Sequence, residues 1–309
     1  MNWLREKLSV IYIFVFEQEG SWSFFAKLYK KHDLIATFDE QIESEAQAHD
    51  YLEELISRAY FSYVCVLVNS IAQGALPNSS RETFKAHDLD FKEHSYFKTG
   101  DICIYAAKSE LAKCKKLFKS VDVDVIFSPF SLLYKSIKNR GFSQTTCCYV
   151  LRYSRFVCVM IFTKEEFRLG NFFYIQDTAS PAFDASNQNE DDEEFADLDD
   201  LSFDKLDDLS IDSDLSSDGF SIFGEEESED LTKLASDMKL KDYLFTLLSE
   251  FYENKLYESD FLEEIVIFEE DKTARSVLGI IESDLLIKPE LVHIDLRELV
   301  LNTIQEELL

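Results

Sequence analysis

Two stretches of this chain each contain three consecutive apolar runs of β-strand character, the first between Ser9 and Asp39 and the second between Thr145 and Asp177. Each triplet is followed by a helix-period segment, a short buried strand, another helix, another strand and another helix. A β-β-β-α-β-α-β-α order that occurs twice is more restrictive than any single motif. Although the two halves show no visible sequence match, the pattern predicts a duplicated α/β protein of two similar lobes.

The first lobe is predicted to span residues 1–142. Residues 70–100 interrupt its order of strands and helices with a cluster of Gly, Pro, Asn and Ser, which indicates an inserted small subdomain or a long loop. The helix that precedes this insertion has the apolar spacing of a core-facing helix, and the strand after that helix is apolar on nearly every residue, as in a sheet covered on both faces. Beyond the triplet, the predicted elements are helix 44–59, strand 62–69, strand 101–107, a helix from Ser109, strand 123–127 and a helix that Ser128 caps and Pro129 begins.

The second lobe is predicted to span residues 143–309, with an acidic insertion at about 180–230. Residues 190–230 hold 19 Asp or Glu against one Lys, which accounts for −18 of the formal net charge of −29. We expect this tract to be disordered on its own, because it cannot bury enough apolar surface, although its regular Leu, Phe and Ile could fold against a partner's groove. The remaining predicted elements are helix 231–253, strand 263–270, helix 273–286, strand 290–296 and a terminal helix from Arg297.

The overall charge and the cysteine pattern exclude several classes of function. A net charge of −29 opposes a simple electrostatic grip on nucleic acid or on an anionic lipid surface. The six cysteines form no CxxC pair, which indicates reduced core thiols in a cytosolic protein. We find no signal peptide and no apolar run near the ~20 residues that span a bilayer. Since the last predicted helix reaches Leu309 without a stop signal, we expect the natural chain to continue beyond it.

The duplicated order resembles the actin-like ATPase fold, in which two ribonuclease-H-like lobes flank a nucleotide cleft. In that fold, tight turns between the first two strands of each lobe hold the ATP phosphates, and they need an Asp for the metal and small residues whose N–H groups face the anion. Here the corresponding residues are Glu17, Gln18, Glu19, Gly20 and Ser21 in the first turn and Arg152, Tyr153, Ser154 and Arg155 in the second.

Neither turn suits a phosphate group. The two Glu of the first turn would repel it, and the second turn has no Gly or Asp; its two arginines could attract an anion, but they also fit a charged surface hairpin. No Walker loop, GxGxxG, HExxH or nucleophile elbow is present. We therefore predict no catalytic and no cofactor-binding residue, and an actin-like ATPase or kinase that binds ATP-Mg through atypical phosphate loops is the disfavoured alternative.

Two weak metal-site patterns occur. Asp214, Ser216, Asp218, Gly219 and Glu225 match the EF-hand calcium spacing, but Ser at position eight departs from it and chance matches are common in so acidic a tract. A calcium- or partner-triggered module centred on residues 190–230 is thus a third hypothesis, against the default of a solvated acidic linker. The other pattern is His87 and His94 among Asp88, Asp90 and Glu93, whose spacing fits no common zinc site, so we predict no metal.

Two passages narrow the resemblance to a family. Residues 101–138 resemble the strand-helix-strand-helix block that closes the first lobe of PilM-like proteins, with an Ala-Ala-Lys turn at residues 106–108 and Asp122 and Asp124 before the next helix. Residues 145–172 resemble the three-strand meander that opens the second lobe, with an RLGN sequence near its turn into the third strand. The acidic insertion matches neither PilM-like nor GspL-like proteins.

This resemblance implies a cytoplasmic scaffold without established motor activity. PilM-like and GspL-like proteins lie at the inner membrane in type IV pilus, competence and type II secretion machines, where they connect the assembly ATPase to bitopic inner-membrane proteins. Because both phosphate turns depart from the ATP-binding pattern, the sequence favours a non-nucleotide, GspL-like use of the fold. The leading hypothesis is therefore an interaction scaffold, peripheral to the inner membrane, whose acidic tract tethers a basic or amphipathic partner surface.

Overall fold

The computed structural model describes residues 8–18, 20–118, 120–153, 156–175, 225–270 and 275–308. Residues of both predicted lobes form one compact unit, Met1–Gln176 with Leu234–Leu309, and Asp177–Lys233, which belongs to the predicted second lobe, is separate from this unit. No helix of the described ranges is long and apolar enough to cross a membrane.

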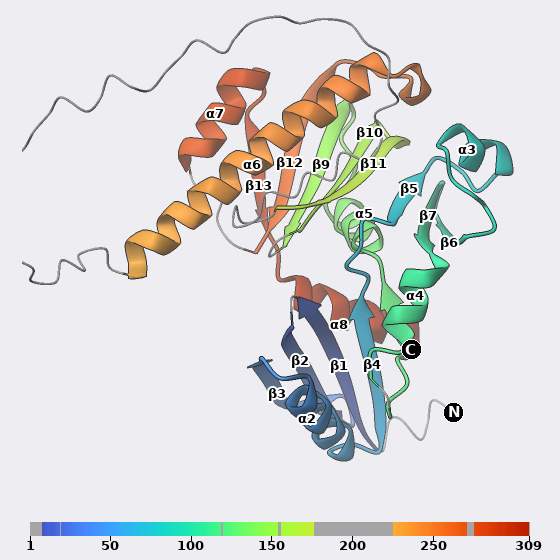
Figure 1. The fold of residues 1–309 in the computed structure, drawn as a ribbon, viewed down its shortest axis with the longest axis vertical. Coiled ribbons are helices and arrows are strands. Elements are labelled where there is room, and N and C mark those ends of the chain that lie inside the picture. The colour runs from blue at the N-terminus through green and yellow to red at the C-terminus, as the bar shows by residue number, and fades with distance from the viewer. Residues whose placement is uncertain are drawn as a thin grey trace, which may run out of the picture. The chain divides into compact units, whose positions relative to one another are not determined.

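Lobe I, the part of the chain before Gly141, is built on a five-stranded sheet in the order β3-β2-β1-β4-β8 (Figure 1). The first three strands form an antiparallel meander, and β4 and β8 extend the sheet in parallel from β1. Its elements are β1 (Ser9–Gln18), β2 (Ser21–Lys30), β3 (Asp33–Ile42), α2 (Glu45–Ser57), β4 (Phe61–Leu67), α4 (Lys108–Lys115), β8 (Val125–Phe127) and α5 (Pro129–Arg140).

Lobe II, the part after Gly141, repeats this topology with a sheet in the order β11-β10-β9-β12-β13. The antiparallel meander and the two parallel additions are again present. Its elements are β9 (Thr146–Tyr153), β10 (Phe156–Thr163), β11 (Glu166–Tyr174), α6 (Glu225–Glu253), the 3₁₀ helix η1 (Lys255–Tyr257), β12 (Leu262–Glu269), α7 (Arg275–Leu285), β13 (Pro289–His293) and α8 (Leu296–Leu308). The identical strand order confirms the predicted duplicated ribonuclease-H-like, actin-like fold.

A third, three-stranded sheet stands apart from the two lobe sheets. It has the order β5-β7-β6 and consists of β5 (Gln73–Leu76), β6 (His94–Thr99) and β7 (Ile102–Ala107), with α3 (Arg81–Ala86) between β5 and β6. The sequence assigned the strand at 101–107 to the lobe itself, whereas the structure pairs β7 with β5 and β6. An apolar run indicates that a strand is buried, but it does not indicate which strand it pairs with.

The two lobes share one hydrophobic core. Helix α2 covers the outer face of the lobe I sheet, and α6 and α7 cover the outer face of the lobe II sheet (Figure 1). Between the sheets, α5 of lobe I packs on β9 and β10, while α8 of lobe II packs on β1 and β2. Because each lobe's last helix packs on the other lobe's sheet, the inner faces of both sheets belong to one buried cluster.

The end of lobe I follows the predicted capping signals. Ser128 is the N-cap of α5 and its Oγ accepts a hydrogen bond from the N–H of Phe130 at 3.3 Å, with Pro129 in the first turn. Gly141 ends the helix with φ of +95°, a conformation that side-chain-bearing residues rarely adopt. This turn directs the chain from lobe I into β9.

Candidate functional site

The first of the two turns that bind phosphate in actin-like proteins is closed by its own carboxylate. The N–H of Gly20 donates to Glu17 Oε1 at 3.0 Å, and Gly20 has φ of +84°. In a phosphate-binding turn such an N–H group would point at the anion. Glu17 therefore takes a position that a phosphate oxygen would need, and Glu19 lies outside the described residues.

The second turn is flanked by a buried ion pair. Arg152, at the end of β9, pairs with Asp237 of α6, and its Nη2 donates to Ser236 Oγ at 3.1 Å. Both Arg152 and Asp237 are buried, the latter completely. The arginine that the sequence left open as an anion ligand thus has an anion within its own chain. Ser154 and Arg155 lie outside the described residues.

Aromatic side chains join the two hairpins. The ring of Phe16, at the end of β1, lies 5.5 Å from the ring of Tyr153 and 6.2 Å from that of Phe156. All three residues are buried. In an actin-like nucleotide cleft the two hairpins face each other across the phosphates, whereas here their described residues pack edge to face. The described part of the hairpins forms an apolar contact between the lobes.

Ion pairs from α8 reinforce this junction. Lys27 Nζ lies 2.5 Å from Glu298 Oε2, which ties β2 of lobe I to α8. Arg297 Nη1 lies 2.9 Å from Asp39 Oδ2, and the guanidinium group stacks over the ring of Phe25 at 5.1 Å. These contacts cross from lobe II to lobe I, so opening the lobes would break charge pairs as well as the shared core.

A groove of about 320 Å³ lies between the small sheet, α4 and the β8 edge of the lobe I sheet. Its walls are mainly apolar, and Lys115 and Asp124 are the two charged residues that line it. Tyr96 and Phe97 of β6 also line it, and they are 41% and 46% exposed. Exposed aromatic rings beside an apolar groove are typical of a surface that binds a partner segment.

The lobe I wall of the groove is held rigidly by Asp124. Its Oδ2 accepts a hydrogen bond from the N–H of Val64 at 2.7 Å, and its own N–H donates to the carbonyl oxygen of Val64 at 2.8 Å. Burial raises the pKa of the Asp124 carboxyl, the hydrogen bond from Val64 partly offsets this effect, and Asp122 adds to it. The Asp124 noted in the sequence therefore anchors the loop before β8.

The small sheet is seated on lobe II by a close backbone approach. A Cβ at Gly170 of β11 would lie 3.1 Å from Ala75 Cβ and 3.1 Å from the ring of Phe130. At the other end of β5, Gln73 Nε2 donates to the carbonyl oxygen of Val68, and Ser128 Oγ donates to Gln73 Oε1, at 2.9 and 2.8 Å. The glycine of the RLGN sequence is thus explained by packing against the small sheet.

The sequence located the insertion but did not indicate its groove. Tyr96 and Phe97 could have been noticed as aromatic residues on a short strand, but their exposure depends on how the small sheet packs. Lys115 and Leu111 come from α4, and Ile126 comes from β8, so the groove forms only when three separate segments meet.

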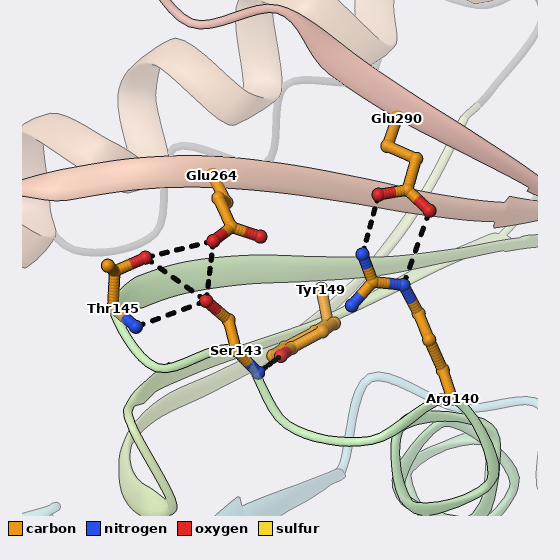
Figure 2. A network of polar contacts seen from close by, with 6 residues as sticks. All are labelled: Arg140, Ser143, Thr145, Tyr149, Glu264 and Glu290. Atoms are coloured by element: carbon orange, nitrogen blue, oxygen red, sulfur yellow. Dashed lines mark hydrogen bonds and ion pairs between the residues drawn. The ribbon is translucent and has the colours of Figure 1, made fainter.

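A polar network fastens the connection between the lobes to the lobe II sheet (Figure 2). Glu264 Oε1 accepts hydrogen bonds from Ser143 Oγ at 2.6 Å and Thr145 Oγ1 at 3.0 Å, while the N–H of Ser143 donates to Tyr149 Oη at 2.8 Å. Arg140 and Glu290 form a two-pronged ion pair beside it, with Nε to Oε1 at 3.3 Å and Nη2 to Oε2 at 2.5 Å. Ser143 and Thr145 lie in the connection between the lobes and Glu264 lies in β12, so these hydrogen bonds fix the connection to the lobe II sheet.

A serine, histidine and carboxylate also meet on the surface of lobe I. Ser120 Oγ lies 2.9 Å from His49 Nε2 and donates to Glu53 Oε1 at 2.6 Å. In a catalytic triad the carboxylate accepts from the second nitrogen of the histidine, whereas here Glu53 accepts directly from Ser120 and lies 3.6 Å from His49 Nδ1. The three residues link α2 to the loop before β8 and do not form a catalytic triad.

The structure describes only part of the two weak metal-site patterns. Asp214, Ser216 and Asp218 lie outside them, and Glu225 is the first residue of α6. His94 Nδ1 lies 2.8 Å from the carbonyl oxygen of Asp90, while the ring of His87 lies against Tyr257 of lobe II. The described ranges contain no group of three potential metal ligands.

Comparisons with known families match both halves of the chain. The profile of a family described as a domain of unknown function (DUF8341) matches residues 148–309, and that of a second domain of unknown function (DUF8569) matches residues 8–134. No curated protein matches the chain in sequence.

Solved structures similar to the chain share very little sequence with it. One is a Bacteroides thetaiotaomicron protein with an actin-like ATPase fold and unknown function, at 10% identity, covering 98% of both chains with a TM-score of 0.49. A PilM-PilN type IV pilus biogenesis complex covers 95% of this chain and 89% of the other, at 10% identity and a TM-score of 0.47. Acetate kinase from Entamoeba histolytica covers 96% and 99%, at 10% identity and a TM-score of 0.40.

Proposed function

This chain belongs to the family described as a domain of unknown function (DUF8341), and we propose that it is a non-catalytic actin-like scaffold that binds a partner segment in the groove beside the small sheet. The proposed setting is the cytoplasmic face of a bacterial pilus, competence or secretion machine, where the scaffold links the assembly ATPase to a bitopic inner-membrane protein. The observation that carries the proposal is the contrast between the two sites: the hairpins are occupied by the chain's own groups, and the groove is open.

The state of the hairpins supports a scaffold that does not bind nucleotide. Glu17 accepts the hydrogen bond of the Gly20 N–H, and Asp237 pairs with Arg152. The ring of Phe16 packs against Tyr153 of the other lobe. A bound triphosphate would have to displace two negative groups of the protein and separate buried aromatic rings. Isothermal titration with ATP and Mg²⁺ at millimolar concentration should therefore give no saturable heat. Saturable binding would favour the ATPase alternative and overturn the proposed non-catalytic role.

The groove supports binding of a short apolar segment. Its volume of about 320 Å³ is at the lower end of the range for ligand pockets, which suits a few side chains of a peptide. The β6 edge of the small sheet and the β8 edge of lobe I both border it, and edge strands can pair with an extended peptide. Lys115 and Asp124 give such a segment polar contacts that fix its direction.

Site-specific photo-crosslinking in cells tests this assignment. A benzophenone amino acid replaces Phe97, which is 46% exposed and lines the groove, and the matched control carries it at Tyr60, which is 71% exposed and lies outside it. The proposal expects position 97 to capture the cytoplasmic segment of a protein with a single membrane span. Equal capture at both positions, or capture only of proteins without a span, would contradict it. A Phe97→Glu variant should lose the captured partner from co-purification.

A further inference from the structure

A second exposed aromatic surface lies on lobe II, formed by three residues that we call the aromatic row. Phe245 and Tyr252 of α6 are 52% and 47% exposed, and Phe261, before β12, is 72% exposed. Phe245 and Tyr252 are seven positions apart and so lie on the same side of the helix. The N–H of Leu262 donates to Tyr252 Oη at 3.0 Å, which places Phe261 next to Tyr252.

The aromatic row is not required by the packing of α6. The helix buries its other side through Leu240, Leu244, Leu247, Leu248 and Phe251, all of which are in the outer core of lobe II. Scattered exposed apolar residues are normal on proteins, but here helix spacing places two exposed aromatic side chains on one side of α6, and the hydrogen bond to Tyr252 holds the third beside them.

The surroundings of the aromatic row are strongly acidic. Residues 242–264 contain seven acidic residues and one lysine, a net charge of −6. Asp242 lies three positions before Phe245 and pairs with Lys241, and Glu258 pairs with Arg168. Both carboxylates are exposed, as are Glu253, which follows Tyr252, and Asp260. A carboxylate-rich rim repels nucleic acid, anionic lipid and an identical copy of the same surface.

We propose that the aromatic row and its carboxylate rim are a docking site for a basic amphipathic helix of a partner protein. The apolar stripe of such a helix would cover Phe245, Tyr252 and Phe261, and its Lys or Arg residues would face the surrounding carboxylates. This site lies on lobe II and is independent of the groove, so the scaffold would hold two partners at once, one with an apolar segment and one with a basic helix.

Binding of a designed helical peptide tests the proposed docking site directly. The probe is a labelled helical peptide of about 18 residues, with Leu at i, i+3, i+4 and i+7 positions and Lys elsewhere; the reference peptide has the same composition in scrambled order. Fluorescence anisotropy follows both peptides on the full chain. Since residues 190–230 also attract lysine, the scrambled peptide measures the non-specific share. We expect the amphipathic peptide to bind at least about tenfold more tightly than the scrambled one.

Substitutions then locate the site. A Phe245→Ser, Phe261→Ser double variant should weaken the amphipathic peptide by about tenfold or more, because aromatic anchors dominate such interfaces. The matched control is Ile71→Ser, Leu286→Ser, which removes two apolar side chains that are 69% and 89% exposed elsewhere on the chain. The single variant Phe261→Ser keeps the test valid if α6 tolerates the double change poorly, because this residue lies outside the helix.

Three results would overturn the proposal. They are equal affinity of the double variant and the unmodified chain, an equal loss in the control variant, and no preference for the amphipathic peptide over the scrambled one. Sedimentation of the unmodified chain adds a fourth: self-association that the Phe245→Ser, Phe261→Ser change abolishes would assign the surface to a second copy instead. Failure of the groove experiment at Phe97 would leave this result unaffected, since the two surfaces are tested by different variants.

Discussion

Replacement of Phe16 by Ala tests whether the lobes are held together by the aromatic contact between the hairpins. Phe16 is 5% exposed and its ring meets Tyr153 and Phe156 of the other lobe. Removing a ring that buries about 150 Å² costs about 4 kcal/mol at ~25 cal/mol per Å², which agrees with the ~3–5 kcal/mol found for buried Phe→Ala changes. This is a large fraction of the ~5–15 kcal/mol by which typical domains are stable.

Urea denaturation gives the change in the free energy of unfolding caused by Phe16→Ala, and hydrogen exchange shows which elements lose protection. Because Phe16 contacts both lobes, protection should fall in β4 of lobe I and in β12 of lobe II. The matched control is Phe261→Ala, the same chemical change at a 72% exposed side chain, which should alter stability by less than about 1 kcal/mol. A Phe16→Ala effect no larger than that of the control, or one confined to lobe I, would refute a shared interlobe core.

Two glycine substitutions should have opposite effects on stability, measured by thermal unfolding. Gly170→Ala places a Cβ 3.1 Å from Ala75 Cβ and should destabilise the protein by about 1–3 kcal/mol. Gly279→Ala, in α7, places a Cβ with no atom within 4 Å and should stabilise the protein by ~0.5–1 kcal/mol. A gain in stability from Gly170→Ala would contradict the close approach of β11 and β5. Burial lowers the pKa of His87 from 6.5, against a smaller opposing effect of Asp88. As the pH falls, His87 is therefore protonated in the unfolded chain before it is protonated in the folded chain. The contribution of neutral His87 to the free energy of unfolding is thus present above pH 6.5 and is lost as the pH falls below it. The His87→Gln variant should lose less stability than the unmodified protein between about pH 7.5 and 5.5. Parallel curves of stability against pH for the two proteins would exclude a contribution of His87 to the pH dependence.

The sequence by itself determined the fold class because the signals involved are local. Strand and helix periodicities and a Ser-Pro cap depend only on neighbouring residues. The order of the predicted elements, which occurs twice, restricts the topology to a duplicated ribonuclease-H-like arrangement. The charge imbalance of residues 190–230 and the unsuitability of Glu17 for phosphate could likewise be read without a structure.

The tertiary structure alone decided which strands pair and which surfaces remain open. Residues 102–107 have the apolar pattern of any buried strand, so only their hydrogen bonds to β5 and β6 place them in the small sheet. The partner of Arg152 is 85 positions away at Asp237, and the groove needs α4, β6 and β8 together. Periodicity records which side of an element is buried; it holds no information on which distant segment covers that side. The groove and the Arg152–Asp237 ion pair are made of such distant contacts, and they therefore appear only in the folded chain.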